Sequence, residues 1–209
     1  MKRWILLCLT MLAFLSALAD PEVGIGCQRL RLRLDPHLTS AIVESDWGSG
    51  KEHSESPAVL ELIGCSGELL DRFPLEGPLA KLEPTPLRGA PAPTYLVSVD
   101  LTAAAGSYSG PLTIPIQVIH DHLIPTVAQT ASGHKQPIHL ALTGKAAWEK
   151  ILVHGQNELL SVSCQPANQG FVTFYRRYYP TSTGWRLRVR SKPGLWESDA
   201  PFPNTSLFP

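Results

Sequence analysis

The sequence predicts an all-β protein, an antiparallel β-sandwich or barrel of about ten short strands with little helix. Three observations support this fold class. Several runs alternate apolar and polar residues, the pattern of strands with one buried face. Turn residues recur roughly every 8 to 14 positions, and only one stretch has a composition that favours a helix. No repeat of fixed period is present, which disfavours a solenoid.

Residues 1–19 have the pattern of a cleaved secretory signal peptide. Lys2 and Arg3 precede an apolar run over residues 4–15, and Ala17-Leu18-Ala19 supplies a small-x-small cleavage site before Asp20. The apolar run is shorter than the roughly 20 residues of a membrane-spanning helix. We therefore expect a secreted or periplasmic chain over residues 20–209, forming a single β-rich domain with no transmembrane segment after signal cleavage.

The charge balance gives no cue toward nucleic acid, because the 18 basic and 18 acidic residues cancel. The charges are unevenly placed, with an acidic excess over residues 35–83 and a basic excess over residues 170–195. No specific nucleic-acid partner is expected. The basic segment instead suggests an unknown protein or an anionic or polysaccharide partner in the exported compartment.

Cysteine usage agrees with export. Cys8 is removed with the signal peptide, so Cys27, Cys65 and Cys164 remain. In an oxidising compartment this odd number predicts one disulfide and one free thiol, with three pairings open. We favour Cys65 with Cys164, because each residue ends an apolar, strand-like run.

The first half of the chain alternates strands with polar segments. Residues 28–34 place Leu on one face and Arg on the other, and residues 46–57 have the composition of a loop. Residues 58–65 and 68–73 form a predicted hairpin around Ser66-Gly67. The six prolines between positions 74 and 93 exclude a helix and a central strand, so this segment should be an extended crossing.

The middle of the chain continues as strands. Residues 94–101 are largely apolar, which predicts burial of both faces or a central place in the sheet. Residues 112–119 form a further strand that Pro115 should place at an edge or a bulge. Four more strands are expected. Residues 122–128 and 137–143 form a predicted pair, and the other two lie at the end of 145–154 and at 158–164.

The C-terminal hairpin is the clearest predicted unit. Its two runs, 171–179 and 185–190, are separated by Pro180-Thr-Ser-Thr-Gly184. Trp185, Leu187 and Val189 should face a core, while the intervening arginines face water. The alternating arginines of residues 28–34 follow the same pattern, and the two rows would form one basic face if they share a sheet. The aromatic residues of the tail after Pro193 should cover a sheet edge.

This hairpin is also the expected contact surface. The candidate binding residues are Arg176, Arg177, Tyr178, Arg186, Arg188 and Arg190. Tyrosine suits such a role, because it brings a large contact area with few rotatable bonds. The leading functional prediction is therefore a non-enzymatic binding or accessory module.

Motifs for catalysis are absent from the sequence. Residues 106–110 have the glycines of a serine hydrolase elbow, but Tyr108 stands at the nucleophile position. No Cys-x-x-Cys pair or Gly-rich phosphate loop occurs, and no cofactor is expected. The alternative function is a small exported hydrolase or metalloprotein that uses His120-Asp121-His122. Histidines two apart on a strand point to the same face, so His120 and His122 could bind one metal ion. His134, His139 or His154 would complete such a site.

Overall fold

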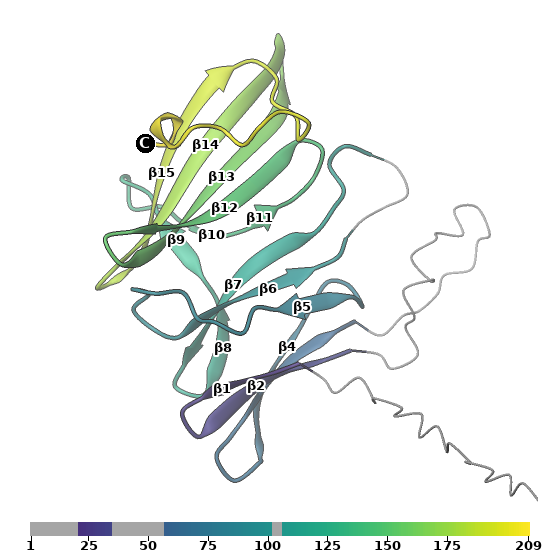
Figure 1. Cartoon of the computed structure of the whole chain (residues 1–209), viewed down its shortest axis with the longest axis vertical. Coiled ribbons are helices and arrows are strands. Elements are labelled where there is room, and N and C mark those ends of the chain that lie inside the picture. The colour runs from purple at the N-terminus through teal and green to yellow at the C-terminus, as the bar shows by residue number, and fades with distance from the viewer. Residues whose placement is uncertain (1–20, 35–56, 102–105) are drawn as a thin grey trace, which may run out of the picture.

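The computed structural model describes residues 21–34, 57–101 and 106–209. The predicted signal peptide and most of the predicted loop at 46–57 lie outside these residues. The described residues are nearly all β, as the sequence predicts, and their strands form three open sheets rather than a closed barrel. Figure 1 shows the sheets stacked as three layers, from the N-terminal strands to the C-terminal hairpin. Within the described ranges, no helix is long and apolar enough to cross a membrane.

The first sheet contains the strands at residues 28–33, 59–63 and 69–74 in consecutive antiparallel pairing. Its order is β1-β2-β3-β4, with β1 (Glu22–Ile25), β2 (Gln28–Arg33), β3 (Val59–Ile63) and β4 (Leu69–Pro74). The predicted hairpin around Ser66-Gly67 is the β3–β4 connection. Leucines of β2 and β3 point to one side and charged residues to the other, which gives this sheet one buried and one polar face.

The middle sheet is formed largely by the apolar central strands. Its order is β11-β7-β6-β5, and β8 also pairs with β7; the members are β5 (Ala80–Leu82), β6 (Thr94–Val99), β7 (Leu112–Ile119), β8 (His122–Pro125) and β11 (Leu140–Ala141). The proline-rich segment contributes only β5, at the edge of the sheet. Pro115 lies inside the central strand β7, where the neighbouring strand changes from β11 to β8. The prediction was an edge position or a bulge. The edge position is wrong, because β7 has neighbours on both sides and the missing N–H of proline is tolerated at this break.

The third sheet is the largest and carries the C-terminal hairpin. Its order is β10-β9-β15-β14-β13-β12, with β9 (Val127–Gln129), β10 (Lys135–Pro137), β12 (Ala146–Val153), β13 (Gln156–Ala167), β14 (Gly170–Thr181) and β15 (Gly184–Pro193). All pairs are antiparallel except β15 with β9. A short 3-10 helix, η2 (Thr205–Leu207), lies in the C-terminal tail.

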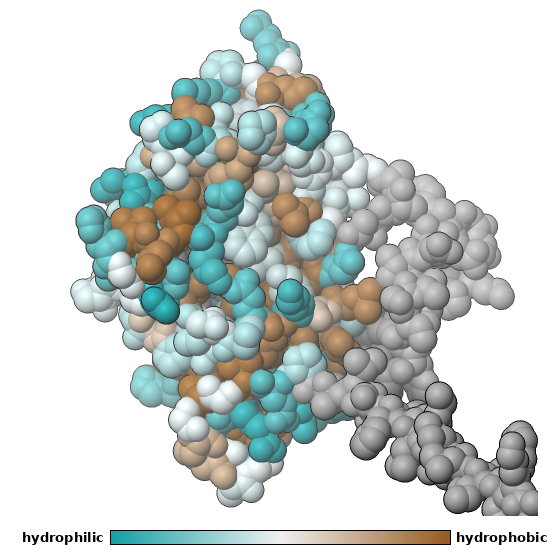
Figure 2. Space-filling view, in the orientation of Figure 1, coloured by the Kyte–Doolittle hydropathy of each residue, from teal (hydrophilic) through white to brown (hydrophobic). Residues whose placement is uncertain are grey.

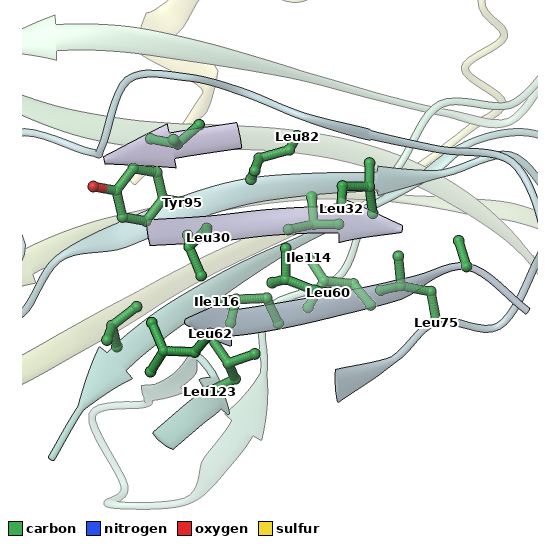
Figure 3. Close-up of a cluster of buried hydrophobic side chains, with 14 of the residues drawn as sticks. Leu30, Leu32, Leu60, Leu62, Leu75, Leu82, Tyr95, Ile114, Ile116 and Leu123 are labelled. Carbon is green, nitrogen blue, oxygen red and sulfur yellow. The ribbon is translucent and has the colours of Figure 1, made fainter. Parts of the chain in front are cut away.

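Two cores share the middle sheet. In the first core, Tyr95, Val97 and Val99 of β6 pack with leucines of β2 and β3, as Figure 3 shows for Tyr95 and its neighbours. In the second core, Leu96 of the same strand packs with side chains of the third sheet. The predicted burial of both faces of this segment is confirmed, because successive side chains of β6 enter different cores.

The tail covers a sheet face instead of the predicted sheet edge. Phe208 is buried against Leu160, Val162 and Tyr175, and its ring stacks on Phe202 with centroids 5.6 Å apart. Figure 1 shows this tail crossing the third sheet. We call the tail-covered side of this sheet the outer face, and the side toward the middle sheet the inner face.

The disulfide joins Cys27 to Cys65, so the predicted pairing of Cys65 with Cys164 was wrong. Cys27 immediately precedes β2 and Cys65 follows β3, and the pairing of these neighbouring strands brings the two Cα atoms within 4.9 Å. Cys164 belongs to β13 of the third sheet and is a buried free thiol. Cys65 and Cys164 each end a strand-like run in the sequence, but these two strands belong to different sheets and are not neighbours.

Candidate functional site

The predicted binding residues of the C-terminal hairpin lie on two opposite faces of the third sheet. Arg177 pairs with Arg188 and Tyr179 pairs with Arg186 across the β14–β15 ladder, so these side chains share the outer face. Arg190, opposite Tyr175, lies on the same face. Arg176 and Tyr178, by contrast, lie on the inner face with Leu187 and Val189. The six residues therefore do not form one surface.

The predicted single basic face with residues 28–34 does not form either. Those arginines belong to β2, in the first sheet, whereas the hairpin arginines belong to the third sheet. The middle sheet lies between these two layers (Figure 1).

Several outer-face arginines are engaged within the protein. Arg177 Nε and Nη2 donate hydrogen bonds of 2.5 and 3.0 Å to the two carboxylate oxygens of Glu158, and this contact raises the pKa of Arg177. Arg188 lies over the Tyr179 ring, 5.3 Å from its centroid, and Arg190 Nη1 donates to the Ser206 carbonyl oxygen of the tail at 3.4 Å. These contacts satisfy part of the donor capacity of this face.

The inner face changes from apolar to polar along its strands. On β13, Leu159 enters the second core, and the next inner-face side chains are Ser161, Ser163 and Gln165. On β15, Trp185 and Leu187 are buried, but Val189 is 47% exposed. The prediction that Val189 faces a core was wrong, because the sheet extends past the layer that covers its inner face.

A groove of about 380 Å³ lies at this transition. Its floor is formed by inner-face residues of β13 and β14, and one wall comes from the β10–β11 segment with Gln136 and His139. The polar groups on its floor are those of Ser161, Ser163, Gln165, Arg176 and Tyr178. No lining residue is acidic.

Arg176 is the only arginine or lysine among the residues that line this groove. Its Nη1 donates a hydrogen bond of 2.5 Å to Ser163 Oγ, and its guanidinium lies 5.1 Å from the Phe174 ring centroid. Among the residues that the structure describes, no carboxylate forms an ion pair with it. Arg176 is thus held in place by a hydroxyl and an aromatic ring, neither of which neutralises its charge.

Tyr178 adds a hydroxyl group to the groove lining. Its side chain is 3% exposed, and burial raises its pKa despite the opposing charge of Arg176. The phenol is consequently protonated at neutral pH and can donate a hydrogen bond. Together, the groove offers hydroxyls, amides, an imidazole and one positive charge to a ligand.

The histidine candidates do not have the geometry that the metal prediction assumed. His120 and Asp121 form the two-residue turn between β7 and β8, with φ of 47° and 66°, so His120 is not on a strand. His122 begins β8, and its Nδ1 lies 3.4 Å from Asp71 Oδ2. A period of two therefore does not apply to His120 and His122, and the part of the chain that the structure describes contains no cluster of three potential metal ligands.

The sequence interpretation included Arg176 and Tyr178 but missed the serines and glutamine beside them. The available signal was the alternation of β13, in which Leu159, Ser161, Ser163 and Gln165 follow one another at every second position. Only the strand register shows that Arg176 stands opposite Ser161 and that the β10–β11 segment closes one side. No protein-family model, curated protein or solved structure matches this chain.

Proposed function

We propose that this protein is an exported, non-enzymatic binding protein that holds an acidic polysaccharide in the inner-face groove. The observation that carries this proposal is Arg176, a groove-lining cation with no carboxylate partner among the described residues. A guanidinium recognises a carboxylate or sulfate through paired, charge-assisted hydrogen bonds. The ligand should therefore present an anionic group to Arg176.

The uncharged groups of the groove support a sugar. Ser161 and Ser163 carry hydroxyls, and Gln136 and Gln165 carry amides, so each side chain can both donate and accept hydrogen bonds. Sugar hydroxyls have the same dual character. The volume of about 380 Å³ falls in the range of small-ligand sites, and the open form of the groove permits a chain to continue beyond the bound residue.

Export is part of the proposal. The basis is the signal-peptide pattern of residues 1–19 together with the Cys27–Cys65 disulfide. Disulfides persist in oxidising compartments and are rare in the cytosol. An anionic polysaccharide of a cell surface or extracellular matrix is a partner that such a protein would meet.

The test compares two ligands and two variants by isothermal titration calorimetry. The ligands are an oligomer of galacturonic acid and a neutral galactose oligomer of equal length, which differ in the carboxylate. We expect the acidic oligomer to bind more tightly and its affinity to fall as salt is added. Arg176→Gln should weaken its binding by roughly tenfold to a hundredfold, the effect of losing a charge-assisted hydrogen bond.

Arg188→Gln is the matched control, since it removes the same charge from the outer face of the same hairpin. The affinity of this variant for the acidic oligomer should stay within about twofold of the affinity of the unmodified chain. Equal losses in the two variants would show that diffuse charge, not the groove, binds the ligand. Equal affinity for the acidic and neutral oligomers would remove the role assigned to Arg176.

A further inference from the structure

A second, smaller pocket lies where β9, β10 and the β14–β15 turn meet. Its volume is about 180 Å³, and it shares no lining residue with the groove. The polar side chains of its lining are those of Gln117, Gln129, Lys135, Thr183 and Arg186. We call it the Lys135–Arg186 pocket.

The two cations of this pocket keep their charge unneutralised. Arg186 Nη1 donates to Gln129 Oε1 at 2.6 Å, and Gln129 Nε2 in turn donates to the Gly133 carbonyl oxygen at 3.1 Å. The second bond fixes the amide so that its oxygen faces the guanidinium. In the described part of the chain neither Lys135 nor Arg186 forms an ion pair, and no residue lining the pocket is acidic.

Two cations beside a cavity without an acid favour an anionic occupant, because bringing like charges together is unfavourable until a counter-charge binds. Trp185 also belongs to the lining, but its ring is buried in the second core on the inner face, so its Nε1–H is not one of the donors offered to the pocket.

The pocket is large enough for a small anion. A volume of about 180 Å³ accommodates a tetrahedral oxyanion. A phosphate or sulfate group only accepts hydrogen bonds when fully ionised, and every polar residue of the lining can donate one.

We propose that the Lys135–Arg186 pocket binds one phosphate or sulfate group, either as a free ion or as the ester group of a larger ligand. Lys135 acts as a mobile point charge at the rim, and Arg186 as a guanidinium held in fixed orientation by Gln129. This site is independent of the proposed function, since it neither uses Arg176 nor requires a polysaccharide in the groove.

The test is a titration of the ¹⁵N-labelled chain followed by NMR at constant ionic strength. Inorganic phosphate, sulfate and glucose 6-phosphate are each compared with chloride, and the Arg186 Nε–H resonance, assigned with Arg186→Gln, reports on the pocket, together with the backbone amides of its lining. We expect saturable shifts with phosphate and sulfate and none with chloride. Equal affinity for phosphate and glucose 6-phosphate identifies a free-ion site, while tighter binding of the ester identifies an ester site.

Variants connect the binding to the two cations. The double variant Lys135→Gln/Arg186→Gln should weaken binding by about tenfold or more, and Arg188→Gln/Lys192→Gln, with the same net charge and both residues outside the pocket, should keep it within about twofold. Lys135→Gln alone changes an exposed side chain and tests the site if the double variant does not fold. Shifts that do not saturate, or that are the same in the pocket variants and the control, would overturn the proposal.

Discussion

Arg31 of β2 lies directly opposite Glu61 of β3, and Arg31 Nη2 donates a 2.6 Å hydrogen bond to Glu61 Oε2. Arg33 and Arg72 approach the other carboxylate oxygen at 3.2 and 3.3 Å. The Glu61 side chain is only 1% exposed, although it lies on the polar face of the first sheet. Three arginines thus cover one carboxylate, which ties β2, β3 and β4 together on the side opposite the core.

Replacing Glu61 with glutamine should lower the free energy of unfolding by about 2 to 4 kcal/mol, because three guanidiniums would lose their shared counter-charge. Urea unfolding at neutral pH measures the change. Glu22→Gln is the control, since Glu22 is an exposed carboxylate at the edge of the same sheet, 3.6 Å from Arg29. Glu22→Gln should lower the free energy of unfolding by about 0.5 kcal/mol or less. An equal loss in both variants would show that Glu61 contributes no more than an exposed carboxylate.

Acid should weaken the fold through the same carboxylate. Burial by itself raises the pKa of Glu61, but the hydrogen bonds and charges of Arg31 and Arg33 outweigh it and hold the pKa below its ordinary value of 4.5. A folded-state pKa below the unfolded one stabilises the protein fully above about pH 4.5, and this contribution disappears as the pH falls through the folded-state value. The stability gap between the unmodified chain and Glu61→Gln should therefore shrink as the pH drops below 4.5. A gap that stays constant down to about pH 2 would contradict this assignment.

The local pattern of the sequence was sufficient for most of the fold. Alternation in residues 28–34 and 185–190, and the largely apolar character of residues 94–101, identified strands with one and two buried faces. These patterns did not show to which of the three sheets each strand belongs. Arg31 and Arg188 have similar local surroundings in the sequence, yet they lie in different sheets, because strand pairing depends on contacts between distant segments.

The candidate site was predictable only in part, for the same reason. Arg176 and Tyr178 stand out in the sequence, but the groove needs the register of β13 with β14 and the approach of the β10–β11 segment. The strand geometry assumed for His120 and His122 does not hold, since the period of two assumes extended residues and His120 has a positive φ.

A stabilising change is expected at the turn between β12 and β13. His154 and Gly155 form this two-residue turn with φ of 48° and 81°. Asparagine adopts positive φ more readily than histidine, and Asn-Gly is a preferred sequence for such turns. His154→Asn should raise the free energy of unfolding by about 0.5 kcal/mol in a urea titration. His134→Asn, at an exposed residue without a positive φ, should leave it unchanged, and an equal gain there would point to a cause other than the turn.

The tail should contribute to the stability of the third sheet through Phe208. Its ring meets Tyr175 edge to face at 5.6 Å and helps to cover Leu160 and Val162. Phe208→Ala would leave these outer-face side chains partly uncovered and should cost about 2 to 3 kcal/mol of unfolding free energy, somewhat less than a fully enclosed phenylalanine. Leu195→Ala, at a half-exposed position of the same tail, should cost about 0.5 kcal/mol or less. If Phe208→Ala unfolds at the same urea concentration as the unmodified chain, the tail is not a structural part of this sheet.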